Sequence, residues 1–283
     1  MIKLGLPNKG RLSDKSIEIL TRAGFRIQTK ERKLSAFCEN FSMEVIFARA
    51  SDIPRFIQDG IIDLGITGQD LVEEQGVQVS QILELDFGQA DLVLAVSKDF
   101  DREQLYAKRL KIATSYPQIT EKFCKTEGIQ AEIIIMSGAV ELAPKLGLAD
   151  AIVDLTSSGE TLRMNDLFPV RTLFESRACL FANREKAKGE GKKIDQIVMA
   201  LQSVLMAYEK KFLIANFPTK SLSELAAIAP GLNGPTVMSI LGREDLCAIQ
   251  VVVNGRDMTG VINQLKKLGA SGLLVTNIEQ MVP

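Results

Sequence analysis

The sequence predicts an α/β protein of two lobes with largely parallel sheets, followed by a smaller α+β module. Short apolar segments typical of buried strands alternate with segments of helical periodicity through most of the chain. At 283 residues the chain is long enough for about two domains. Hydrophobic residues make up 46% of it and charged residues 24%, so we expect ordinary globular cores.

The first lobe is predicted from three apolar strands, each followed by a helix. The strands are expected at residues 2–6, 43–48 and 61–67. Gly24 is expected to end the first helix, and Ser51 is expected to cap the amino end of the second. The third helix is expected to open at residues 68–70.

A second series of similar units predicts the second lobe. Its strands are expected at residues 92–97, 111–114, 132–136 and 151–155, and its helices at residues 119–125 and 139–146. The apolar segment 178–183 is predicted to be a strand that returns across the molecule, which would leave a cleft between the lobes. We therefore assign residues 1–88 and 180–210 to the first lobe and residues 89–179 to the second.

The last part of the chain has a different character. The polar segment 186–193 is predicted to be a solvated turn, and residues 194–207 have the periodicity of a long helix. After Pro218 the expected elements are helices at 222–228 and 256–268, a dense turn at 230–235, and strands at 248–253 and 272–278. This β-α-β order predicts a small α+β module, which we assign to residues 211–283.

Charge and hydropathy exclude several classes of function. Lys and Arg total 34 against 35 Asp and Glu, so the chain lacks the strongly basic surface that binds nucleic acid. No segment approaches the roughly 18 uninterrupted apolar residues of a membrane-spanning helix. The amino end lacks the long apolar stretch of a signal peptide, so we expect a cytoplasmic protein.

The sequence contains no histidine, which excludes Ser-His-Asp and Cys-His catalysis and histidine zinc ligands. The four cysteines lie far apart, and we expect them to be small buried side chains in a reducing compartment. Any chemistry must therefore use carboxylates, Lys and Arg, hydroxyls, backbone amides, or an oxygen-bound ion.

Residues 150–162, with the sequence DAIVDLTSSGETL, are the most informative segment. An apolar strand ends at Asp154 and is followed by hydroxyls, a glycine and a helix-compatible segment. Unpaired backbone N–H groups at such a turn favour a phosphate, and Gly159 would let the backbone approach it closely. The carboxylate of Asp154 suits ribose hydroxyls or Mg²⁺. An ordinary Ser/Gly loop with a helix cap is the alternative.

Several segments together give the chain a family resemblance. In order, they are LPNKGRL, ARASDIP, DLGITGQDLVEE, MSGAVELAPKLGLADAIVDLTSSGETL, PGLNGPT and LGASGLLVTNIEQMVP. Their order and spacing resemble the long, self-regulated form of ATP phosphoribosyltransferase, the first enzyme of histidine biosynthesis. The resemblance implies a two-lobed body like that of periplasmic binding proteins and a C-terminal ACT-like (ferredoxin-like) regulatory domain.

The resemblance also implies a reaction and its residues. Phosphoribosyl pyrophosphate (PRPP) would transfer its phosphoribosyl group to N1 of ATP, with Mg²⁺ as cofactor and Asp154 beside the metal or the ribose. The residues implied for PRPP are Glu141, Asp154, Thr156, Ser157, Ser158, Gly159, Glu160 and Thr161. Catalysis is implied for Lys9, Arg11, Arg49, Glu141 and Asp154, and ATP binding for Arg11, Gln69, Asp70 and Tyr116.

This reaction does not require a catalytic base, because adenine N1 already carries a free lone pair. The barrier lies in the charge of the leaving pyrophosphate and of an oxocarbenium-like centre, which cations, Mg²⁺ and orientation can stabilise. The absence of histidine is therefore consistent with the transferase.

Feedback inhibition by histidine is implied for the C-terminal module. Residues at matching positions are Asn216, Leu232, Gly234, Val252 and Gly272. A module that serves only oligomerisation is the alternative for these residues, and the resemblance suggests dimers that assemble into hexamers. The alternative for the whole chain is a non-catalytic cytoplasmic small-molecule binding protein, which would not explain the phosphate loop and the basic turn at Lys9 and Arg11.

Overall fold

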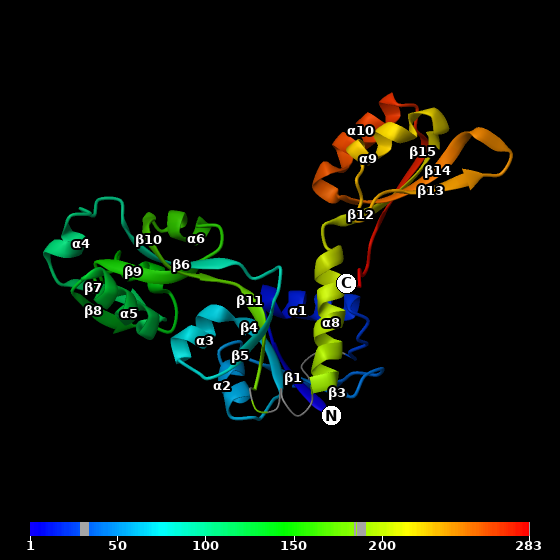
Figure 1. Ribbon diagram of the computed structural model, residues 1–283. Helices are drawn as coiled ribbons and strands as arrows, with labels where there is room; N and C mark the ends of the chain where they lie inside the picture. The colour runs from blue at the N-terminus through cyan, green and yellow to red at the C-terminus, as the bar shows by residue number, and fades with distance from the viewer. Residues whose placement is uncertain (29–33, 184, 186–190, 283) are drawn as a thin grey trace. The chain divides into compact units, whose positions relative to one another are not determined.

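The computed structural model describes residues 1–28, 34–183, 185 and 191–282 (Figure 1). The chain divides into two compact units, Met1–Thr21 with Phe25–Asp195, and Arg22–Gly24 with Gln196–Pro283. The first unit contains two β-sheets and the second contains one. The predicted fold class, two α/β lobes and an α+β module, is confirmed. The expectation of largely parallel sheets was wrong, because antiparallel strands complete both sheets of the first unit, which are therefore mixed.

The first sheet has six strands in the order β2-β3-β1-β4-β11-β5. Their bounds are β2 Ser35–Phe37, β3 Met43–Ala48, β1 Ile2–Pro7, β4 Leu64–Gly68, β11 Ala178–Ala182 and β5 Ser80–Glu84. Strands β3, β1 and β4 are parallel, whereas β11 runs antiparallel to both of its neighbours. The connecting helices are α1 Arg11–Arg22, α2 Ile53–Gln58 and α3 Gln69–Gln75.

Gly65 of β4 sets how closely α2 packs on this sheet. Its neighbour in register, Gly5 of β1, faces the Ile62 side chain instead, whose Cδ1 lies 2.5 Å from the place of a Cβ atom. A Cβ atom at Gly65 would lie 2.5 Å from Cγ2 of Ile53 and 2.9 Å from Cδ1 of Ile57, so α2 occupies the space that a side chain would need. Both isoleucines are fully buried, and they anchor α2 on the sheet.

The second sheet has five strands in the order β10-β6-β9-β7-β8. Their bounds are β10 Leu167–Ser176, β6 Ala90–Ser97, β9 Ala151–Thr156, β7 Leu110–Thr114 and β8 Ala131–Ile135. Strands β9, β7 and β8 are parallel, and β6 and β10 complete the sheet in antiparallel pairs. Its helices are α4 Gln104–Ala107, α5 Pro117–Glu127, α6 Glu160–Met164 and the 3₁₀ turn η1 Val140–Leu142.

Two short crossovers join the sheets. Residues 85–89 lead from β5 to β6, and Arg177 alone separates β10 from β11. The crossovers run side by side, since Leu85 donates its N–H to the Ala178 carbonyl and Ala178 donates its own to the Phe87 carbonyl. Ser176, the last residue of β10, pairs with Ala90, the first residue of β6, and β11 starts opposite the last residue of β4. Both crossovers therefore lie at the carboxyl ends of the parallel strands.

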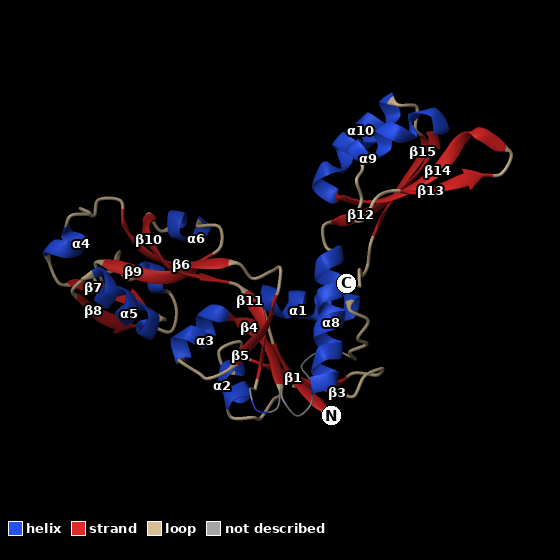
Figure 2. Ribbon diagram, in the orientation of Figure 1, coloured by secondary structure: helices blue, strands red, loops and turns tan. Residues whose placement is uncertain are grey.

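The second unit contains an antiparallel sheet in the order β13-β14-β12-β15 (Figure 2). Its elements are α8 Gly191–Ala207, which begins in the first unit, β12 Lys210–Pro218, η2 Thr219–Ser221, α9 Leu222–Ile228, β13 Thr236–Ile240, β14 Arg243–Asn254, η3 Gly255–Asp257, α10 Met258–Lys267 and β15 Ser271–Asn277. Helices α9 and α10 cover one face, where alternate residues of β12 and β14 form a buried core. In the described part of the chain, no helix has the length and apolar character to cross a membrane.

Two local predictions were wrong, and a third was wrong in the part that the structure describes. Ser51 is not a helix cap, because α2 begins at Ile53 after Asp52 and has Pro54 in its first turn. Residues 139–146 form only the 3₁₀ turn η1, because Ala139 adopts a left-handed conformation and Pro144 lacks an N–H. Of the predicted turn 186–193, residues 186–190 lie outside the described residues, and residues 191–193 belong to α8.

Candidate active site

Several predicted catalytic and ATP-binding residues of the first unit lie near the carboxyl ends of parallel strands. Lys9 and Arg11 come after β1, Arg49 after β3 and Tyr116 after β7, and Asp154 lies in β9, two residues before its end. In the first sheet, β3 lies on one side of β1, and β4, which comes later in the chain, lies on the other side of β1. Ligands of open α/β sheets bind where the strand order reverses in this way. The same reversal occurs between β7 and β9 in the second sheet.

Three basic side chains at the first sheet edge are exposed. Within the described ranges, Lys9, Arg11 and Arg49 have no acidic partner. The loop of Arg49 is fixed, because Ala48 accepts a hydrogen bond from the Asn8 N–H and Ala50 accepts one from the buried Thr67 hydroxyl. This edge therefore presents unpaired positive charge on an ordered backbone, as an anion requires.

The loop from Asp154 to Thr161 is open to solvent at its centre. Ser157 and Ser158 are exposed, and Gly159 has a φ of +69°, which favours glycine. The Thr156 hydroxyl accepts the N–H of Gly159 at 2.9 Å, and the Ser158 hydroxyl lies 3.4 Å from the N–H of Glu160. The loop is thus shaped by its own hydroxyls, while its tip remains accessible to a ligand.

A carboxylate stands just before this loop. Asp154 is half-buried and accepts the N–H of Leu155 at 2.8 Å. Burial raises the pKa of the Asp154 carboxyl, and the negative charge of Glu141 on η1 raises it further. The two acidic residues that the family resemblance implies for the ribose therefore influence each other electrostatically, and their contact with ribose stays a prediction.

Asp70 and Tyr116, predicted to bind ATP, contact each other. The Tyr116 hydroxyl donates to Oδ2 of Asp70 at 2.9 Å, and the Ser176 hydroxyl donates to Oδ1 at 2.5 Å. Burial first, and then the charge of Asp70, raise the pKa of Tyr116 far above its usual range, and Asp154 acts in the same direction. Tyr116 is therefore near both acidic groups, and Asp70 is almost fully buried by its partners.

Gln69 lies at the crossover. Its side-chain amide donates to Gln81 at 2.9 Å and accepts the N–H of Arg177 at 3.1 Å. Its own N–H donates to the Arg177 carbonyl. The side chain is engaged in holding the crossover, and its contact with ATP stays a prediction.

The predicted histidine-site residues lie in two places in the second unit, on its sheet and in the loop before β13. Asn216 of β12 is beside Gly272 of β15, where a Cβ atom would be 3.3 Å from the Asn216 amide nitrogen. Leu232 and Val252 line a separate hollow together with Lys210 and Asp257. In the loop before β13, the Gly234 N–H donates to the Pro230 carbonyl.

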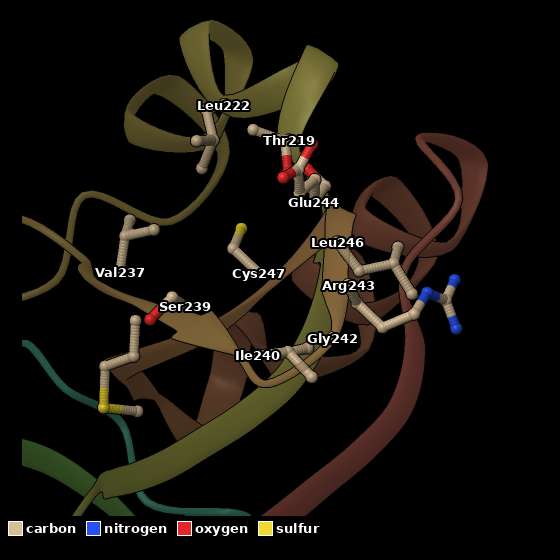
Figure 3. A pocket seen from close by; sticks show the side chains of 11 residues that line it. Thr219, Leu222, Val237, Ser239, Ile240, Gly242, Arg243, Glu244, Leu246 and Cys247 are labelled. Atoms are coloured by element: carbon tan, nitrogen blue, oxygen red, sulfur yellow. The ribbon is translucent and has the colours of Figure 1, made fainter.

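A further hollow of about 690 Å³ lies beside the β13–β14 hairpin (Figure 3). Its lining residues are Thr219, Leu222, Val237, Met238, Ser239, Ile240, Gly242, Arg243, Glu244, Leu246 and Cys247. None of the predicted site residues lines it.

The cysteines have the predicted character, since all four are buried and form no disulfide. Burial raises the pKa of Cys124 to about 11 and of Cys179 to about 12. Thiols with such pKa values are poor nucleophiles near neutral pH, so these two cysteines are structural.

Comparison with known proteins decides the family. Residues 49–203 match the family described as "HisG: ATP phosphoribosyltransferase", and residues 207–280 match "HisG, C-terminal domain". The ATP phosphoribosyltransferase of Methanosarcina barkeri is 43% identical over the full length of both chains. The chain belongs to the ATP phosphoribosyltransferase family. This family membership makes it a glycosyltransferase of the first step of histidine biosynthesis, and the C-terminal match implies feedback regulation by histidine.

Other ATP phosphoribosyltransferases agree with this result. The enzyme of Methanopyrus kandleri is 42% identical, again over the full length of both chains. Among solved structures, the ATP phosphoribosyl transferase (HisG:HisZ) complex from Thermotoga maritima matches with a TM-score of 0.66 and 28% identity. That match covers 73% of this chain and 99% of the other. Family membership favours a transferase over the alternative of a non-catalytic binding protein.

The sequence did not identify Ser176 or Glu74, which hold parts of this site in place. Ser176 bonds Asp70, and Glu74 accepts two N–H groups of α5. Ser176 is 106 residues from Asp70, so no local pattern connects them. For Glu74, the acidic pair Glu73-Glu74 on a short helix was the one available signal.

Asp154 is expected to lower the stability of the ligand-free protein. Because its pKa is raised, the folded protein binds this proton more tightly than the unfolded chain does. The folded state is favoured while this carboxyl is protonated. That contribution to stability is fully present below about pH 4, and it is lost as the pH rises through the raised pKa. We expect Asp154→Asn, which keeps the acceptor for Leu155, to increase the free energy of unfolding at pH 7.5 by about 0.5–2 kcal/mol.

Urea unfolding at pH 7.5 and pH 4 measures this effect, with exposed Asp99→Asn as the control. The gain should shrink at the lower pH, and the control should stay within about 0.5 kcal/mol of wild type. An Asp154→Asn protein less stable than wild type at pH 7.5 would contradict the destabilising role.

Proposed function

We propose that the loop from Asp154 to Thr161 binds the 5-phosphate and ribose of PRPP in the reaction of this transferase. Support comes from the exposed Ser157 and Ser158, the left-handed Gly159, and the pair of carboxylates beside them. Asp154 and Glu141 would accept hydrogen bonds from the ribose hydroxyls. Each hydroxyl donor would relieve the repulsion between the two carboxylates, so binding the sugar would stabilise the site.

Lys9, Arg11 and Arg49 are proposed to bind the pyrophosphate of PRPP and the triphosphate of ATP. Lys9 and Arg49 lie in the segments after β1 and β3, and Arg11 is the first residue of α1. The crossovers join this sheet edge to the edge that carries the PRPP loop. Two polyanions can occupy one site only if cations offset their repulsion. These three side chains are suited to this, since among the described residues they have no ion pair to surrender on binding.

Adenine N1 of ATP would attack C1 of PRPP. The nitrogen lone pair forms the new N–C bond, and the C1–O bond breaks with its electron pair leaving on pyrophosphate. The three basic residues would stabilise the departing negative charge, which is the main electrostatic contribution expected here. Gln69, Asp70 and Tyr116 would border the nucleotide, with Asp70 holding the Tyr116 hydroxyl in place.

Mg²⁺ is the proposed cofactor, and the residues present fit it. Magnesium is usually held by one or two carboxylates together with substrate oxygens, and Asp154 and Glu141 supply two carboxylates. When bound, the ion would neutralise phosphate charge on the substrates.

The observation that carries the proposal is the convergence of distant segments at the crossovers. Arg49, Tyr116 and Asp154 all follow or end strands at the two sheet edges that Arg177 connects. We also propose that the enzyme acts in the cytoplasm, because its substrate ATP is available there.

Histidine is proposed to bind the C-terminal domain at Asn216 and Gly272, with Leu232, Gly234 and Val252 contributing from the rest of the domain. The domain is also proposed to assemble dimers into hexamers. The sheet face opposite α9 and α10 supports this, because it carries apolar side chains that are partly or largely exposed, namely Phe212, Ile214, Met238 and Leu274.

Replacement of Arg49 tests the proposed substrate charges. We expect Arg49→Ala to lower kcat/KM for PRPP about 100-fold, because one cation is lost where negative charge develops. Pyrophosphate release from ATP, PRPP and Mg²⁺ is the measurement. Arg55→Ala is the matched control, since Arg55 is exposed on α2 and pairs with Asp59, and it should stay within twofold of wild type. Wild-type turnover by Arg49→Ala would exclude the proposed role.

Replacement of Asn216 tests the regulatory site. Hydrogen bonds to a charged ligand contribute about 1.5–3 kcal/mol, so Asn216→Ala should raise the histidine concentration for half-inhibition about tenfold or more. Asn263→Ala on the exposed face of α10 serves as the control and should leave inhibition unchanged. Equal inhibition of wild type and Asn216→Ala would remove Asn216 from the site.

A further inference from the structure

Three acidic residues of α3 contact α5 or Tyr116 just before it, and α5 packs on the other sheet of the first unit. Asp70, Glu73 and Glu74 are spaced so that they lie on one face of α3. Their partners lie at the start of α5 or on its first two turns. We call this set of contacts the α3–α5 clasp, formed by Asp70, Glu73 and Glu74 with Tyr116, Gln118, Ile119 and Lys122.

Glu74 makes the most specific contact of the clasp. Its Oε1 accepts the N–H of Gln118 at 2.9 Å, and its Oε2 accepts the N–H of Ile119 at 3.0 Å. The first N–H groups of a helix have no partner within the helix, so this carboxylate satisfies two of them from outside. The negative charge also lies at the positive end of the α5 dipole. Both oxygens of one side chain are therefore committed to the other lobe.

Glu74 is half-buried, and burial raises the pKa of its carboxyl although the two N–H donors act in the opposite direction. The Glu73–Lys122 pair, at 2.6 Å, is exposed, and exposed pairs of this kind contribute about 0–1 kcal/mol. Glu74 is thus the member of the clasp whose loss should affect the position of α5 most.

The clasp also includes the buried Asp70, whose place depends on Gly68. A Cβ atom at Gly68 would lie 2.1 Å from Oδ1 of Asp70. Only glycine at this position leaves room for the carboxylate to reach Tyr116 and Ser176. An alanine would displace the carboxylate without changing its charge.

We propose that Glu74 is a positioning residue for the transfer reaction, acting through α5 to hold the two lobes at the spacing the reaction needs. The inference rests on the proposed function, in which basic residues of one lobe and the PRPP loop of the other act on the same substrates. Reacting groups must be held within about 3–3.5 Å, and a displacement of about 1 Å can lower the rate about 100-fold. Tyr116 immediately precedes α5, so a shift of α5 also moves its phenol.

Glu74→Gln tests the proposal, because it keeps the size of the side chain but leaves one acceptor oxygen and no charge. Hydrogen exchange on the ligand-free protein should show the amides of Gln118 and Ile119 exchanging about tenfold faster or more. Steady-state kinetics should show kcat reduced about tenfold or more, while the PRPP dissociation constant, measured without ATP, stays within twofold of wild type. Glu121→Gln is the control, since Glu121 is near Glu74 on α5 but forms none of the clasp contacts.

Each result decides the proposal. Faster amide exchange with an unchanged kcat would show that the clasp bond does not position the reacting groups. Unchanged exchange would show that the bond is not formed. If the wild-type protein does not bind PRPP, the proposed function is wrong. Failure of the Glu74 proposal and failure of the proposed function are therefore distinguishable. If Glu74→Gln does not fold, Glu74→Asp gives the second test. It keeps the charge, but its shorter side chain draws the carboxylate away from the N–H groups of Gln118 and Ile119, so it should also reduce kcat with PRPP affinity retained.

Discussion

The meeting of two sheet edges at Arg177 and the neighbouring crossover is the constraint on which the site depends. Parallel strands direct their following loops to one edge, and a one-residue connection between β10 and β11 leaves the two edges no room to separate. Residues as distant in sequence as Asp70 and Ser176 therefore bond each other. A longer connection would permit the same two sheets without this convergence.

Electrostatics at the site favour bound substrates over the ligand-free protein. On the second sheet edge the charge of Glu141 disfavours the ionised form of Asp154, while on the first edge Lys9, Arg11 and Arg49 have no acidic partner among the described residues. A phosphorylated sugar or a metal ion would supply the opposite charges. The ligand-free protein is thus less stable because its site holds charges that the reaction needs, which is a common feature of active sites. Without histidine, the chain has no side chain whose ordinary pKa lies near neutrality, which agrees with catalysis by charge and orientation.

Much of the fold could be predicted from hydrophobic pattern, for physical reasons that differ between elements. Strands β1, β3 and β11 are predominantly apolar, and β11 is buried along its whole length, so these three were found. Strand β10 was not, because it is half-exposed, contains Pro169 and has two irregularities in its pairing with β6. The expected helix at 139–146 was wrong because its apolar spacing could not reveal the left-handed Ala139.

The site could be predicted only as a set of separate motifs. The loop after Asp154 has a local chemical pattern, and the remaining residues were assigned by resemblance. Contacts across the lobes, such as Tyr116 with Asp70 or Glu74 with α5, depend on tertiary arrangement that no local pattern encodes.

A crystal structure of the protein with PRPP and Mg²⁺ is the most direct test of this account. We expect the 5-phosphate on the backbone amides of residues 157–159, with the Asp154 carboxylate at the ribose hydroxyls. An empty loop in crystals that hold PRPP elsewhere would contradict the account.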